Sequence, residues 1–175
     1  LWVDLVELTH LMKLNICYTI FMTKLIPIIM FCLLANHCDA NENKTLKLLI
    51  ENRSCIGCNL SGLNLGWYNL LKVDLSGADL SKSYLVNVDL SNTNLSNTNL
   101  SNTYMNGANL SKATLVKTNL RGSELELADF SQAVFVDVNL TEAYLLHASI
   151  SEEQLKNAQL CKTVLPDAST SYRDC

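Results

Sequence analysis

The sequence predicts a solenoid, a fold in which the backbone turns at a fixed interval and stacks on itself. Two observations predict it: the period of one short repeat and the residue types within that repeat. Every fifth residue from Leu60 to Leu165 is large and apolar, without an exception. On an α-helix five residues advance by about 500°, so these side chains would spread around the helix instead of forming a stripe. In a strand an odd period would send successive side chains to opposite faces. All of them can reach one core only if the chain turns once in every five residues.

The positions around each large apolar residue are biased as well. The residue two positions before it is mostly small, and the residue one before it is mostly Asn or Asp. A serine often follows it, as at Ser76, Ser81 and Ser91. This A-(N/D)-L-S-x pattern, which runs from about Cys55 to Ala168, closely resembles the pentapeptide-repeat family.

The resemblance implies an all-β fold, a right-handed quadrilateral β-helix with four pentapeptides in each square coil. The large apolar residue and the small residue two before it would point inward, and the other three positions would point outward. Coils would stack about 4.8 Å apart through backbone hydrogen bonds. Residues twenty apart would then share one outer face, and the repeats would occupy residues 55–168.

The N-terminal end of such a solenoid must be covered, because an open end exposes core side chains and unpaired backbone. Residues 41–54 predict a short capping α-helix, since Leu46, Leu49 and Ile50 fall on one helical face. We expect this helix to close the first coil.

At the C-terminal end, Ser151 and Gln154 have the spacing of a capping box, so a helical turn is expected to interrupt the last coil. The repeat register places Glu153 at an inward position there. Pro166 is expected to end the ladder, and residues 169–175 are expected to form a loose tail.

The first forty residues are not expected to belong to the fold. Residues 22–40 contain a lysine, an apolar run and small residues near the end, the pattern of a Sec signal peptide. The apolar run is too short to span a bilayer, which needs about 20 residues, so no membrane anchor is expected after cleavage. We therefore predict a bacterial periplasmic or secreted protein. Residues 1–21 are interpreted as an upstream extension or an extended n-region.

Signal removal would leave four cysteines, Cys55, Cys58, Cys161 and Cys175. The two ends of the ladder lie about 24 Å apart at strand spacing, whereas a disulfide needs Cα atoms within about 7 Å. Only the pairings Cys55–Cys58 and Cys161–Cys175 remain within the chain, unless the tail folds back, and an oxidising compartment would allow either bond to form. The C-x-x-C run could also be half a zinc site or a redox pair, but no second C-x-x-C follows, and core packing explains both cysteines. We predict no metal and no cofactor.

Sorting residues by a period of twenty gives four outer faces, one of which is not mainly polar. It carries large side chains at outward positions, namely Trp67, Tyr84, Val86, Tyr104, Leu127, Tyr144, Leu146 and His147. Aromatic side chains on a flat, exposed side form a candidate recognition surface. Two alternatives are the stacking of strand-favouring aromatics along a β surface and a homodimer interface.

These features predict a non-catalytic exported structural or protein-interaction module with an unknown protein partner. An enzyme is disfavoured, because a packed rod has no concavity in which acid, base and nucleophile converge. The alternative is a cytoplasmic DNA mimic that binds or protects a type II topoisomerase, as the resemblance implies for some family members. The export signal and a net charge of only −4 disfavour that role and a nucleic-acid partner.

Overall fold

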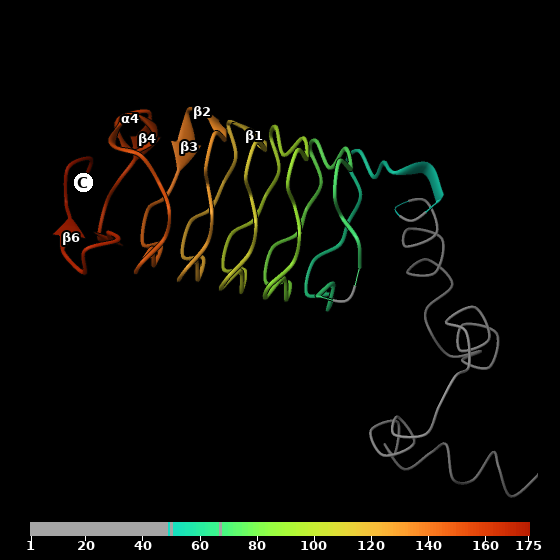
Figure 1. The fold of residues 1–175 in the computed structure, drawn as a ribbon, viewed down its shortest axis with the longest axis horizontal. Helices are drawn as coiled ribbons and strands as arrows, with labels where there is room; N and C mark the ends of the chain where they lie inside the picture. The colour runs from blue at the N-terminus through green and yellow to red at the C-terminus, as the bar shows by residue number, and fades with distance from the viewer. Residues whose placement is uncertain (1–48, 50, 67) are drawn as a thin grey trace, which may run out of the picture. The chain divides into compact units, whose positions relative to one another are not determined.

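The protein is described by a computed structural model that places residue 49 and residues 51–66 and 68–175 (Figure 1). Every described residue belongs to one compact unit. The predicted extension at 1–21 and the predicted signal peptide at 22–40 therefore lie outside the described residues.

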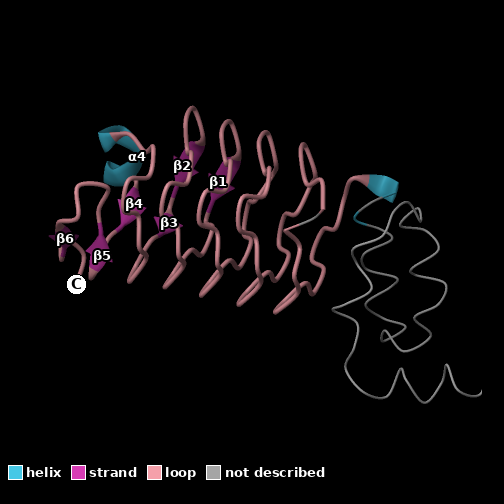
Figure 2. Cartoon of the chain, turned by 60° about the horizontal axis from the view of Figure 1, so that its bottom comes forward, coloured by secondary structure: helices cyan, strands magenta, loops and turns pink. Residues whose placement is uncertain are grey.

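Between Ser54 and Val164 the chain winds into stacked coils in which residues twenty apart pair in parallel (Figure 2). The pairing begins with Ser54 and Asp74 and ends with Tyr144 and Val164. Most contacts are single bridges. Longer parallel pairs join β1 (Thr114–Val116) to β2 (Val134–Val136), and β3 (Val138–Asn139) to β4 (Ala158–Gln159). This register confirms four pentapeptides per coil.

Most pentapeptides end in a tight turn, which explains the period of five. The carbonyl of the large apolar residue accepts a hydrogen bond from the N–H three residues on, as in Ala78 N to Leu75 O at 3.0 Å. Where it is described, the third residue of such a turn has a positive φ, for example 67° at Gly77 and 58° at Asn92. Glycine and asparagine tolerate this left-handed conformation best, which accounts for their frequency at the last position of the repeat.

The core is a column of fully buried large side chains, such as Leu100 and Phe130, with small residues between them. Serine and threonine are accepted at the small position because their hydroxyls donate to backbone carbonyls. Ser83 Oγ donates to Leu80 O at 2.6 Å within one coil, and Thr98 Oγ1 reaches back to Leu75 O at 2.8 Å. No buried side-chain nitrogen or oxygen among the described residues lacks a partner.

Only the last part of the predicted N-terminal helix falls within the described residues. Leu49, Glu51 and Asn52 are helical, and Leu49 is 1% exposed and packs in the hydrophobic core. Residues 41–48 and residue 50 of the segment predicted at 41–54 lie outside the described residues.

The helical turn expected near the C-terminal end is α4 (Glu152–Lys156), and its capping box forms between Ser151 and Gln154. The expectation that Glu153 points inward is wrong, because the helix shifts the register by one residue. Gln154 is buried instead, and its Nε2 donates to the carbonyls of Phe130 and Ala133 at 2.8 Å each. An ionised carboxylate at that position has no proton to donate to these oxygens.

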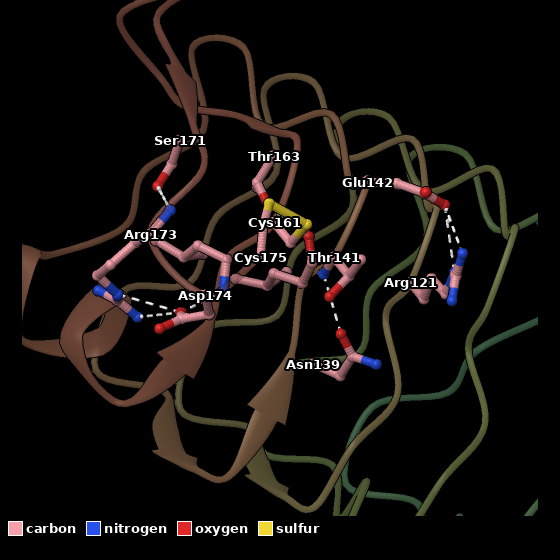
Figure 3. The surroundings of a disulfide bond; sticks show 12 residues. Arg121, Asn139, Thr141, Glu142, Cys161, Thr163, Ser171, Arg173, Asp174 and Cys175 are labelled. Atoms are coloured by element: carbon pink, nitrogen blue, oxygen red, sulfur yellow. Dashed lines mark hydrogen bonds and ion pairs between the residues drawn. A yellow bond between two sulfur atoms is a disulfide. The ribbon is translucent and has the colours of Figure 1, made fainter.

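The expectation of a loose C-terminal tail is also wrong. The chain reverses after β5 (Thr163–Val164), and β6 (Thr170–Ser171) pairs with β5 in antiparallel fashion. Asp174 then binds Leu160 twice, by its backbone N–H at 2.8 Å and its carboxylate at 2.7 Å, and Cys175 joins Cys161 (Figure 3). The periodicity ends where the chain leaves the repeat, so it carries no information on this hairpin.

Candidate protein-interaction surface

We use the name tyrosine face for the outward side chains Tyr84, Val86, Tyr104, Leu127, Tyr144, Leu146 and His147. Backbone bridges fix the order of its central column: Tyr84 pairs with Tyr104, Tyr104 with Glu124, and Glu124 with Tyr144. The structure thus brings the three tyrosines into one line. Tyr84 and Tyr104 lie on adjacent coils, and Tyr104 and Tyr144 lie two coils apart with Glu124 between them. Trp67, also predicted for this face, lies outside the described residues.

Two of the tyrosines stack on each other and still face solvent. The ring centroids of Tyr84 and Tyr104 are 4.8 Å apart with an angle of 11° between the planes. Tyr84 is nevertheless 49% exposed and Tyr104 43% exposed, and Leu127 beside them is 63% exposed. The alternative of aromatic stacking along the β surface is therefore part of the observed arrangement, and it leaves nearly half of the surface of each tyrosine residue exposed.

The tyrosine face also carries two carboxylates, Glu124 and Glu126, which the sequence analysis does not single out. The twenty-residue register alone is enough to place Glu124 between Tyr104 and Tyr144. Within the described residues, neither carboxylate has a hydrogen bond from another side chain or an ion pair. The described lysines and arginines all lie on other faces, on α4 or at the ends: Arg53, Lys72, Lys82, Lys112, Lys117, Arg121, Lys156, Lys162 and Arg173.

On the other faces the polar groups already bind one another. Asn99 Nδ2 and the backbone N–H of Ser81 both donate to Asp79 Oδ1 at 3.0 Å. Burial alone would raise the pKa of Asp79, but hydrogen bonds from Ser81 and Asn99 outweigh it, so the pKa lies below its usual value. Such ladders stabilise the stack of coils and leave few free donors or acceptors for a ligand.

Groups that could carry out chemistry do not converge in the described residues. No cluster of three or more His, Cys, Asp or Glu side chains there could hold a metal ion. A shallow pocket of about 770 Å³ lies between β2 and α4. Its lining residues Arg173 and Asp174 bind each other at 2.9 Å (Figure 3), so their charges are already compensated.

The four cysteines in the described residues form two disulfides, one near each end of the ladder. Cys55 bonds to Cys58 with Cα atoms 5.3 Å apart, and Cys161 bonds to Cys175 with Cα atoms 4.9 Å apart. These are the two pairings that the sequence left open. Over the part of the chain that is described, no helix is long and apolar enough to cross a bilayer.

Comparison with known proteins gives one matching family and several similar folds. A family model described as pentapeptide repeats matches residues 58–97, 83–122 and 123–165, in eight copies. The crystal structure of Rfr23, a pentapeptide repeat protein from the cyanobacterium Cyanothece 51142, is 30% identical with a TM-score of 0.58, covering 63% of this chain and 89% of Rfr23. HetL from Nostoc sp. strain PCC 7120, a pentapeptide repeat protein involved in heterocyst differentiation regulation, is 29% identical with a TM-score of 0.63, covering 67% of this chain and 55% of HetL.

A third structure, QnrB1, a plasmid-mediated fluoroquinolone resistance protein, is 19% identical with a TM-score of 0.25, covering 54% of this chain and 56% of QnrB1. A likeness of that extent carries no argument about function. Comparison with curated proteins finds no match.

Proposed function

The chain belongs to the pentapeptide-repeat family, and we propose that it is an exported, non-catalytic module that binds a partner protein through its tyrosine face. The observation that carries the proposal is the pair Tyr84 and Tyr104, which are stacked at 4.8 Å and yet about half exposed. Tyrosine is enriched at the centres of protein interfaces, because its ring offers a large contact area and its hydroxyl a hydrogen bond.

The rigidity of the ladder favours binding at this surface. The backbone N–H of each tyrosine is hydrogen-bonded to the preceding coil: Tyr84 N donates to Leu63 O, and Tyr104 N donates to Ser83 O. Their rings also restrain each other. Side chains that are already ordered lose less conformational entropy when a partner binds, so more of the contact energy appears as affinity.

Export is part of the proposal, as are the right-handed winding and the N-terminal capping helix that the family resemblance implies. Two disulfides in the described residues support an oxidising compartment, because thiols are kept reduced in the cytosol. The signal pattern at residues 22–40 supports the same compartment. Determining the N-terminus of the secreted protein by mass spectrometry tests this part, and an uncut chain retained in the cytoplasm would contradict it.

The binding proposal is tested by pull-down from the envelope and extracellular fractions with the wild type and the double variant Tyr84→Asp/Tyr104→Asp. The matched control is Val134→Asp/Val136→Asp, which adds the same two charges at exposed apolar positions of another face. We expect partners captured by the wild type to be lost with the tyrosine variant and retained with the control. Equal capture by all three proteins would refute the proposal. Light scattering of the purified chain identifies the case in which the partner is a second copy.

A further inference from the structure

We infer that the tyrosine face recognises a basic segment of its protein partner, with an arginine or lysine side chain seated against Glu124 between Tyr104 and Tyr144. This inference rests on the proposed function and specifies the chemistry of the partner. It is drawn from the order of residues in the central column and from the distribution of charge over the four faces.

The column offers a cation two kinds of contact at one place. Because Tyr84 and Tyr104 are nearly parallel, one side of the Tyr104 ring is covered by Tyr84, and the other side faces the coil of Glu124. Tyr144 follows on the next coil, so Tyr104 and Tyr144 stand two coils apart, about 9.6 Å at strand spacing. A guanidinium or ammonium group beside Glu124 would meet a carboxylate and the electron-rich face of a tyrosine ring together.

The negative charge of this face is not compensated within the described part of the chain. Glu142, on a neighbouring face, receives two hydrogen bonds from Arg121, at 3.0 and 3.2 Å (Figure 3). Glu124 and Glu126 have no such cation, although the described chain carries nine lysines and arginines elsewhere. A partner surface gains most from this arrangement when it supplies the missing positive charge, and an acidic partner or nucleic acid would be repelled.

The apolar surroundings define the rest of the ligand. Val86 and Leu127 are exposed on the same face, two and three residues beyond the column, at 41% and 63%. They can bury the aliphatic stems of arginine or lysine, whose charged heads remain at the carboxylates. The occupant is therefore an extended basic peptide segment, with cationic side chains spaced along the coils.

The test measures binding of short fluorescein-labelled peptides by fluorescence anisotropy at low ionic strength. The probes alternate Arg with Ser, Lys with Ser, or Glu with Ser. The variant Glu124→Gln/Glu126→Gln removes both charges, and the matched control Asp137→Asn/Glu153→Gln removes two exposed charges outside the tyrosine face. We expect the Arg and Lys probes to bind the wild type and the control, the Glu probe not to bind, and the Gln variant to bind about tenfold more weakly.

Absence of binding of the basic probes to the wild type would overturn the inference. It would also be overturned by equal affinities for the wild type and the Gln variant, or by an equal loss in the control. The pull-down described above separates this failure from that of the proposed function. If a partner is lost with Tyr84→Asp/Tyr104→Asp but retained with Glu124→Gln/Glu126→Gln, the tyrosine face binds a partner that is not basic.

Discussion

Gln154 is predicted to hold the C-terminal coil in place, and Gln154→Leu tests this with a nearly volume-conserving change. The wild-type amide donates to Phe130 O and Ala133 O at 2.8 Å, and its Oε1 accepts from the backbone N–H of Ser151 at 2.8 Å. Leucine leaves these three backbone groups without that partner, and the two carbonyls lie in a buried setting. At about 1 kcal/mol for a lost hydrogen bond, and up to about 3 for a buried group left unpaired, the free energy of unfolding should fall by about 2 to 5 kcal/mol.

The assay is urea unfolding followed by circular dichroism, with Gln159→Leu as the matched control because Gln159 is exposed on β4. The stability of a solenoid is a sum over neighbouring coils, so hydrogen exchange should show the loss at the C-terminal coils first. The amide of Leu140, which donates to Gln159 O at 3.0 Å, is a suitable reporter. A Gln154→Leu protein within about 0.5 kcal/mol of the wild type would refute the reasoning.

Three further predictions concern the turns, the ladders and the tail. Gly107→Ala should lower the free energy of unfolding by more than Gly77→Ala does. Both positions have positive φ, which costs about 1 kcal/mol with a Cβ, but at Gly107 the Cβ would also clash with Asn87 Oδ1, so the Asn87 side chain must shift. Equal losses in thermal unfolding would show that the Asn87 side chain shifts without cost and would contradict the prediction. Because the pKa of Asp79 is lowered from 3.8, the hydrogen bonds of its carboxylate should stabilise the fold above that pH, and this contribution should be lost as the pH falls below it. Asp79→Asn should therefore flatten the acid limb of a curve of unfolding free energy against pH. An unchanged acid limb would contradict the prediction. Cys175→Ser removes a disulfide of sequence separation 14, so it should destabilise the terminal hairpin by about 3 kcal/mol and speed tryptic cleavage after Lys162. An unaltered digestion rate would show that the hairpin is stable without the bond.

The repeat itself could be predicted from the sequence because its signal is local and redundant. The residues at Leu60, Leu65 and Leu70 already define the period, and each later repeat restates it. The pairing of residues twenty apart then follows from four turns per coil, and the amino-acid sequence alone therefore places Tyr84 next to Tyr104 on adjacent coils. Two exposed rings in direct contact are a consequence of that register.

The parts that could not be predicted are those where the repeat is interrupted. Helix α4 replaces a turn, and the helical geometry rather than the repeat decides that Gln154 faces inward. The terminal hairpin depends on long-range contacts between Asp174 and Leu160, which have no periodic signal. Glu124 was not predicted for another reason. In the sequence, a candidate surface is recognised by its aromatic and apolar residues at outward positions. A charged residue at an outward position is common in the repeat, so Glu124 does not stand out.

Every surface assigned to this protein depends on the twenty-residue register of its coils, and paired cysteines measure that register directly. Ser76 and Ser96 lie on adjacent coils, where Gly77 N donates to Ser96 O at 2.8 Å, so Ser76→Cys/Ser96→Cys should form a disulfide in high yield under mild oxidation, detected by peptide mass spectrometry. Ser76→Cys/Val86→Cys, ten residues apart and therefore on opposite sides of the coil, should form almost none. Similar yields for the two pairs, or a higher yield for the second, would contradict the register and with it the alignment of Tyr84, Tyr104, Glu124 and Tyr144.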